Sequence, residues 1–278
     1  MAAALASLTA LFYGLADFAG GLGSKRHPAW TVVAGSQIMG LPVLILALFI
    51  WPPDVWSWRD FLIGGVGGYL GLVGLSLLYF ALARGTMAVI APVTGVVYLL
   101  VGLIVDLFGG SRLTSFQWTG MALAATAVLL IGGSRTRGAA DKKLLWAAAG
   151  AGLGFGALNV IFAMTDAASG LTPILGARAF SIPFAVAVVL LRGDSLKIVG
   201  PGRWLIIAAG ALDVGANVSL LTALHMGTLS IVNAISGMYP AVTAVVALLV
   251  LKERLTPRQS SGVATALLAV AFLAGVFG

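Results

Sequence analysis

The sequence predicts an all-α integral membrane protein of ten transmembrane helices, arranged as two inverted five-helix repeats. Three observations support this fold class. Hydrophobic residues make up 60% of the 278 residues and charged residues only 9%, too few charges to cover a water-soluble surface. Apolar segments long enough to span a membrane, about 20 residues each, recur along the chain. One short motif also occurs twice, half a chain length apart.

The repeated motif is an Arg-Leu-Thr sequence followed at fixed spacing by a glutamine and a glycine. It starts at Arg112 in the first copy and at Arg254 in the second, an offset of 142 residues. Between Leu78 and Gly120, 12 of 43 positions are identical to their counterparts, about three times the chance expectation. Extended without gaps, the same offset pairs Tyr13 with Phe155, Gly14 with Gly156, and Asp17 with Asn159.

Ten apolar segments can be counted along the chain. They run over residues 4–23, 30–50, 61–82, 87–107, 115–132, 144–164, 172–191, 203–224, 229–250 and 259–277. The highly charged link 134–143 separates the halves, so we expect one repeat over 1–137 and another over 143–278. Because each half crosses the bilayer five times, the second repeat must enter it upside down, which predicts a pseudo-twofold axis in the membrane plane.

The basic residues predict how the chain is oriented in the membrane. Of the 16 Lys and Arg residues, 13 fall in links after odd-numbered segments or at their edge, where Arg203 begins the eighth segment. Arg59 and Arg112 fall in the other links, and Arg178 lies inside a segment. The positive-inside rule therefore places both termini outside and the link 134–143 in the cytoplasm. This distribution accounts for the pI of about 10.1 without a nucleic-acid partner. We expect a multi-pass membrane protein whose partners are lipid and a small-molecule substrate, with a monomer as the simplest state.

Several kinds of chemistry are excluded or disfavoured. The chain has no cysteine, and its two histidines, His27 and His225, lie in distant links, so neither a metal site nor a cofactor is expected. No GxSxG, HExxH, GxGxxG or Walker motif is present, which argues against an enzyme. A channel or a structural membrane subunit fits the composition but does not account for an inverted repeat.

Ionisable groups inside apolar segments are candidate functional residues because they are costly to place in a membrane. Asp213 lies in the middle of the eighth segment and Asp17 in the inner part of the first. Arg178 lies about two turns into the seventh segment. A structural role in fixing the packing is the alternative for each. Proton antiport would require a titrating carboxylate, for which Asp213 is the first candidate and Asp17 the second.

Polar and aromatic residues at similar depths in the two halves predict the lining of a substrate cavity. Together with the two acids, the candidates are Tyr13, Asp17, Tyr69, Ser76, Tyr79, Thr94, Tyr98, Phe155, Asn159, Asp213, Asn217, Asn233, Ser236 and Tyr239. Any one of them alone could instead serve packing between helices. Gly14 and Gly156 are candidates for close helix packing or gating, and Pro92 and Pro240 for local weakening of a helix.

The five-plus-five segments, the Tyr13-Gly14 and Phe155-Gly156 pairs, and the sequence Leu251–Thr256 followed by Gly262 resemble the EamA family of the drug/metabolite transporter superfamily. Within it, the chain is most similar to YddG-type amino-acid exporters of bacterial inner membranes. The resemblance implies export of amino acids, including aromatic ones, by alternating access through a central cavity. Export of drugs or other metabolites is the alternative. In one departure from the family pattern, Ser111 replaces the acid found at the equivalent Glu253.

Overall fold

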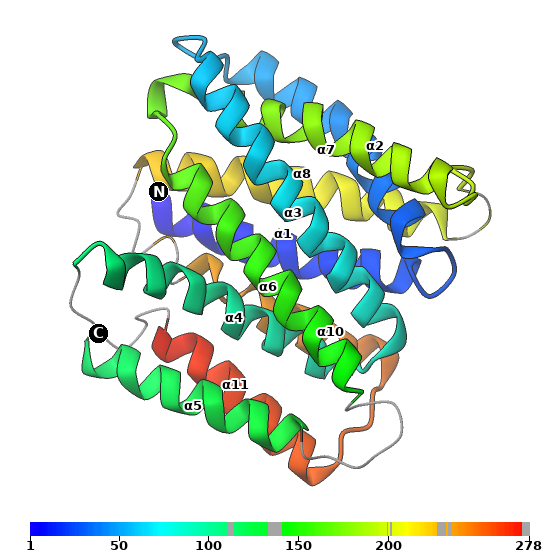
Figure 1. Cartoon of the computed structure of the whole chain (residues 1–278), viewed down its shortest axis with the longest axis vertical. Helices are drawn as coiled ribbons and strands as arrows, with labels where there is room; N and C mark the ends of the chain where they lie inside the picture. Colours follow the sequence, from blue (N-terminus) through cyan, green and yellow to red (C-terminus); the bar gives the residue numbers. More distant parts are fainter. Residues whose placement is uncertain are drawn as a thin grey trace.

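The computed structural model describes residues 1–110, 114–132, 141–198, 200, 202–226, 232 and 235–273. These residues form ten α-helices and one short 3-10 helix, with no β-strand among them (Figure 1). The helices of the first half are α1 (Ala2–Gly23), α2 (Ala29–Ile50), α3 (Trp58–Arg84), α4 (Met87–Phe108) and α5 (Ser115–Gly132). Those of the second are α6 (Lys142–Ala163), η1 (Ala167–Ser169), α7 (Thr172–Leu191), α8 (Arg203–Met226), α10 (Tyr239–Leu251) and α11 (Pro257–Leu273).

Seven of the described helices, α1 to α4 and α6 to α8, are long and apolar enough to cross a membrane. In hydrocarbon a helix satisfies its own backbone hydrogen bonds, which is why such sequences fold this way. The shorter apolar helix α10 covers only the later part of the predicted segment 229–250, whose start lies outside the described residues. The all-helical prediction is thus confirmed, whereas the inversion of the second half stays a prediction.

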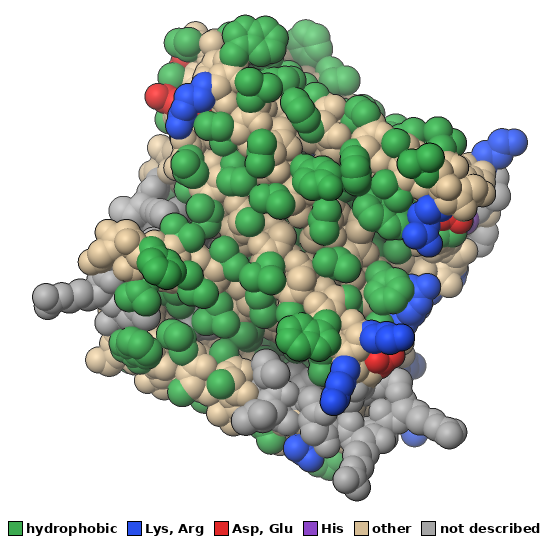
Figure 2. Space-filling view, in the orientation of Figure 1, with side chains coloured by type: hydrophobic (Ala, Val, Ile, Leu, Met, Phe, Trp, Pro, Cys, Tyr) green, Lys and Arg blue, Asp and Glu red, His purple; other side chains and the backbone are tan. Residues whose placement is uncertain are grey.

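The surface fits a lipid environment. Phe49, Leu191 and Leu249 are among many large apolar side chains that are mostly exposed. Figure 2 shows that apolar side chains cover the broad middle of one face, while Lys and Arg gather mainly along its right and lower right edge. Contiguous apolar surface of this extent indicates contact with a membrane rather than with water.

The helices of the two halves contact one another in exchanged pairs. Helix α1 packs against α8, and α6, which holds the same place in the second half, packs against α3. Likewise, α2 packs against α8 and α7 against α3, while α5 and α11 contact each other along one side of the bundle (Figure 1). Helices from opposite halves therefore make most of the close contacts near the centre of the molecule.

One end of the bundle is closed by tightly packed apolar side chains. This end carries the basic links between α1 and α2, between α3 and α4, and between α7 and α8 (Figure 1). A large buried cluster fills it, with Val32, Leu82, Met87 and Ile206 at no more than 1% exposure. We call this the basic end of the bundle.

Glu253 links the two halves at the basic end. Its Oε1 accepts a hydrogen bond from the backbone N–H of Met87 at 3.0 Å, and its Oε2 accepts one from Ala88 at 3.0 Å. These N–H groups belong to the first turn of α4, where no acceptor from within the helix is available. A carboxylate there also interacts favourably with the helix dipole.

The repeated sequence motif forms a helix cap in both copies. The backbone N–H of Thr114 donates to Gln117 Oε1 at 2.8 Å, and the backbone N–H of Gln117 donates back to Thr114 Oγ1 at 3.3 Å. Thr256 and Gln259 make the same pair of bonds, at 2.9 and 3.3 Å. Both are capping boxes, which satisfy free backbone donors at the start of α5 and α11.

Candidate functional site

A cavity lies at the centre of the bundle, displaced from the basic end. It contains about 840 Å³ of empty space, including the part that opens to solvent. Its walls come from the middle of α1, α2, α3, α4 and α8, from the C-terminal half of α6, from the N-terminal half of α7 and from the start of α10. The cavity therefore lies toward the link between α6 and α7, at the end of the bundle opposite the basic one.

Three charged side chains line this cavity. Arg178 of α7 and Asp213 of α8 form an ion pair in which an Nη of the guanidinium donates to a carboxylate oxygen, and both side chains are largely buried. The third is Asp17 of α1, which is 5% exposed and has no cationic partner among the described residues. The pair satisfies two charges that neither helix could carry alone in hydrocarbon.

Two residues of the cavity lining carry a buried donor that the described part of the protein leaves unsatisfied. The Arg178 Nε and the Tyr239 hydroxyl have no hydrogen-bond partner among the described residues. Asn217 is held differently, since its side-chain amide donates to the backbone carbonyl of Asp213 at 2.8 Å. Buried donors without partners are costly in free energy.

Aromatic rings from both halves form another part of the wall. The ring of Tyr239 packs edge-on against Tyr13, with centroids 5.8 Å apart, and against Tyr98, with centroids 5.7 Å apart. Phe155 of α6 lines the same cavity. The arrangement offers aromatic edges and faces to a flat or apolar group.

The structure brings nine of the predicted lining residues to the cavity: Tyr13, Asp17, Tyr98, Phe155, Asn159, Asp213, Asn217, Ser236 and Tyr239. Both repeat-related pairs, Tyr13 with Phe155 and Asp17 with Asn159, are in this set. Their role in binding a substrate stays a prediction. Asn233 lies outside the described residues.

Four predicted residues lie away from this cavity. Tyr69 is 42% exposed and packs on Phe184, on the outer face of the bundle. The hydroxyls of Ser76 and Thr94 donate to carbonyls of their own helices, at 2.8 and 3.2 Å. The ring of Tyr79 is buried against α1 next to Gly20, at the basic end. Each is polar in an apolar segment, but its side chain is not part of the cavity lining.

Two uncharged polar residues of the lining were not among the predicted ones. Gln37 of α2 and Ser181 of α7 both line the cavity, and the Ser181 hydroxyl donates to Gln37 Oε1. Both are polar residues within predicted apolar segments, and this polarity could have identified them from the sequence. Arg178 and Asp213 were both recognised as charged residues inside segments, but their pairing was not predicted.

The predicted glycines lie at close helix contacts. A Cβ atom added to Gly14 would meet Val242 of α10 at 2.4 Å, and one added to Gly156 would meet Val101 of α4 at 2.6 Å. Backbone carbonyls follow in both places, Tyr239 at 2.8 Å and Tyr98 at 3.0 Å. The two contacts are alike, with partners 141 residues apart. The partners Val101 and Val242, like Tyr98 and Tyr239, are thus one residue closer in sequence than the offset of 142 that relates the two halves.

The two prolines have different positions. Pro92 lies inside α4, as predicted. Pro240 lies in the first turn of α10, where the missing N–H interrupts no helical hydrogen bond. Within α10, Pro240 therefore leaves the helical hydrogen bonds intact, and its role in gating stays a prediction. Its ring packs against Gly95 of α4.

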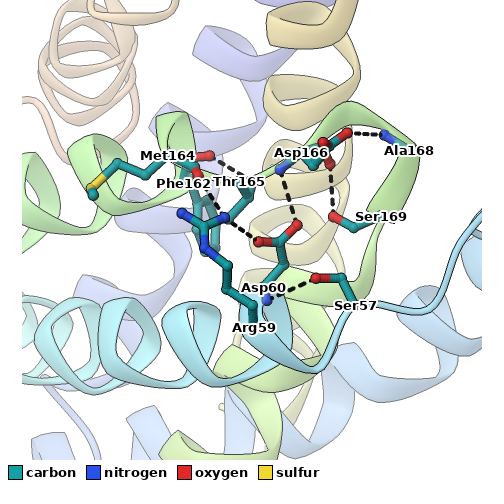
Figure 3. A network of polar contacts seen from close by, with 9 residues as sticks. All are labelled: Ser57, Arg59, Asp60, Phe162, Met164, Thr165, Asp166, Ala168 and Ser169. Carbon is teal, nitrogen blue, oxygen red and sulfur yellow. Dashed lines mark hydrogen bonds and ion pairs between the residues drawn. The ribbon is translucent and has the colours of Figure 1, made fainter.

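A polar network holds the segment between α6 and α7 at the cavity end (Figure 3). The carboxylate of Asp60, at the start of α3, accepts hydrogen bonds from Arg59 at 2.9 Å and from the backbone N–H of Asp166 at 3.0 Å. Ser57 caps α3, since its hydroxyl accepts the Asp60 N–H at 3.2 Å. The network thus fixes the link whose flanking helices supply Phe162 and Ile174 to the cavity wall.

Comparison with known proteins follows the same division into halves. A family model described as the EamA-like transporter family matches residues 1–133 and again residues 143–275. One solved crystal structure, described only as that of a protein, has a TM-score of 0.66 and 18% sequence identity. The match covers 98% of this chain and 97% of that one. No curated protein matches the sequence.

Proposed function

The chain belongs to the EamA-like transporter family, and we propose that it exports amino acids, aromatic ones among them, from the cytoplasm of a bacterium. The family consists of membrane transporters of the drug/metabolite superfamily. The observation that carries the proposal is the cavity between the halves, which combines opposite charges with aromatic rings. It supports a YddG-type exporter in the inner membrane.

The groups in the wall complement the parts of an amino acid. Arg178 presents a buried guanidinium N–H to a carboxylate, and Asp17 presents a carboxylate to an ammonium group. Tyr13, Tyr239 and Phe155 supply an aromatic wall for the side chain.

The arrangement of the helices supports alternating access as the mechanism. The cavity lies toward one end of the bundle, while the other end is closed by the apolar cluster and by Glu253. Most central contacts join a helix of one half to a helix of the other. Rocking of one half against the other would open the basic end and close the opposite one around a fixed site.

Reconstituted transport tests this proposal. Proteoliposomes loaded with labelled phenylalanine, leucine or alanine should release label faster than empty liposomes, with saturation and with inhibition by unlabelled substrate. Replacement of Tyr239 by Phe removes a hydroxyl from the cavity wall and should lower the transport rate. Replacement of Tyr69 by Phe removes one from the outer face and serves as the matched control. Efflux without saturation would indicate a channel.

A drug exporter is the second candidate, because the wall also contains Leu72, Leu75, Leu158 and Phe162. An apolar wall of this kind accepts organic solutes that lack an amino-acid backbone. Saturable transport of hydrophobic organic cations with no flux of any amino acid would favour it over the amino-acid proposal.

The predicted orientation can be tested separately, because the chain has no cysteine of its own. Single cysteines at Ser195, in the basic link between α7 and α8, and at Ala167, in η1, should label from opposite sides of the membrane. The positive-inside rule predicts cytoplasmic access for position 195 and outside access for position 167. The reverse pattern would overturn the orientation and the direction of export together.

A further inference from the structure

The two carboxylates of the cavity differ in how their charge is balanced. Asp213 has the Arg178 guanidinium as its ion-pair partner. Asp17 is more deeply buried and has no cation within ion-pair distance among the described residues. When all three groups are ionised, the cavity therefore carries one net negative charge, and it is located on Asp17.

The surroundings of Asp17 do not offset this charge. Its own helix contributes Tyr13, the packed helix α8 contributes Asp213, α3 contributes Tyr79, and α10 contributes Tyr239. Across the cavity are Arg178 of α7, already paired, and Tyr98 of α4, while α2 contributes the uncharged Gln37. Asp213 repels a negative charge at Asp17, and the tyrosines are neutral. Among the described residues, no lining group balances an ionised Asp17.

An isolated carboxylate in a low-dielectric site is unfavourable unless it gains a proton or a cation. A proton and an organic ammonium group can each neutralise Asp17, but they cannot occupy it together. Tyr13 and Tyr239 place aromatic rings at the same site, and such rings favour a desolvated ammonium group.

We propose that Asp17 is the site at which the cavity exchanges one proton for the ammonium group of its substrate, so that cationic and zwitterionic amines bind and carboxylates without an amine do not. In the exchange, the protonated carboxyl group of Asp17 releases its proton to solvent, and the resulting carboxylate pairs with the incoming ammonium group. One positive charge replaces another. The inference rests on the proposed function and assigns its coupling to Asp17 in place of Asp213.

Binding measurements on the purified full-length protein test this without transport. Three probes share one phenyl group and differ in charge: 2-phenylethylamine is a cation, phenylalanine a zwitterion, and 3-phenylpropionate an anion. Calorimetry should show binding of the first two and at least tenfold weaker binding of the third. Affinity for the amine should fall as the pH is lowered, by at most about tenfold per pH unit, the limit for one competing proton. Binding in weak buffer should release up to one proton per amine.

Three variants give the comparison. Asp17→Asn should lose the amine preference, the pH dependence and the proton release, whereas Asp17→Glu should retain all three. Asp194→Asn, outside the cavity, is the charge-matched control. If Asp17→Asn does not fold, Asp17→Glu and the pH dependence of the wild type still decide the question. Amine binding that is independent of pH and releases no proton would overturn the inference.

The outcomes also separate this inference from the proposed function. Saturable amino-acid efflux that ignores both pH and the Asp17→Asn change would leave the export proposal standing and remove the role of Asp17. Binding of 2-phenylethylamine that depends on Asp17, with no flux of any amino acid, would support the exchange site and contradict the proposal of amino-acid export.

Discussion

The two halves of the chain agree closely at some positions and differ at others. Thr114 and Thr256 begin their helices with the same two hydrogen bonds. Gly14 and Gly156 meet a valine and a tyrosine carbonyl in the same way. These positions serve the fold of each half, in which every helix must be capped and packed. Because both halves need the same caps and close contacts, these residues recur in both halves of the sequence.

The charged groups that act between the halves show the opposite behaviour. Asp17 of the first half corresponds to the uncharged Asn159, and the ion pair of the second half, Arg178 with Asp213, corresponds to Ser36 and Gly71. The turn that supplies Glu253 to α4 has Ser111 as its counterpart. A site shared by both halves binds one solute, and its groups need to occur only once. Divergence between the halves thus marks residues that act across the molecule.

The largest effect is expected from breaking the ion pair, which only the second half carries. Arg178→Met leaves Asp213 without a partner in a buried site and should destabilise the protein by about 3–5 kcal/mol. The double variant Arg178→Met with Asp213→Leu should recover most of that loss, because no unpaired charge remains. Thermal unfolding in detergent measures both. Equal instability of the single and double variants would show that the pair has a packing role instead.

Close glycine contacts, which both halves share, come next. Gly14→Ala and Gly156→Ala place a Cβ at 2.4 and 2.6 Å from a valine, and each should cost about 1–3 kcal/mol. Since the contacts are alike, the two losses should be similar. Gly102→Ala is the control, since nothing lies within 4 Å of the added atom. Clearly unequal losses would contradict the structural equivalence of the two sites.

Substitution of Glu253 is expected to destabilise the protein by a similar or smaller amount. Glu253→Ala removes the acceptor of two backbone N–H groups at the closed end, which should cost about 1–3 kcal/mol. Glu253→Gln keeps one acceptor oxygen and should lose less. If the contact also holds the basic end shut, a single cysteine at Val32 should become more reactive in the Glu253→Ala background. Unchanged stability and reactivity would exclude both roles.

Much of this arrangement follows from the sequence because the strongest signals are those of the repeat and of polarity in apolar segments. The ten segments and the pairs Tyr13–Phe155 and Asp17–Asn159 belong to this class. The sequence does not show which way a side chain points from its helix. Membrane helices are apolar both toward lipid and toward their neighbours, so periodicity does not separate the two faces. Tyr69 on the outer face and Tyr98 in the cavity could not be told apart without the packing.

The remaining residues depended on contacts between segments far apart in the chain. Gln37 and Ser181 are separated by 144 residues and meet only because α2 packs against α7. The pairing of Arg178 with Asp213 likewise required α7 and α8 to be placed. For this reason, the sequence favoured Asp213 as the coupling carboxylate, and the geometry instead favours Asp17, which has no cationic partner among the described residues.

The smallest effect is expected from the two helix caps, and it tests the likeness of the halves most finely. Thr114→Ala and Thr256→Ala each remove the hydroxyl that accepts a backbone N–H, for a loss of about 1 kcal/mol. The glutamines should differ, because Gln259 is 2% exposed, whereas the bonds of Gln117 are exposed to solvent. Gln259→Ala should therefore cost more than Gln117→Ala, since an empty buried space adds to the lost hydrogen bond. Thermal unfolding of all four variants in one detergent makes the comparison. Equal losses at the threonines with unequal losses at the glutamines would show that the same cap lies in two different surroundings, and equal losses at all four would contradict it.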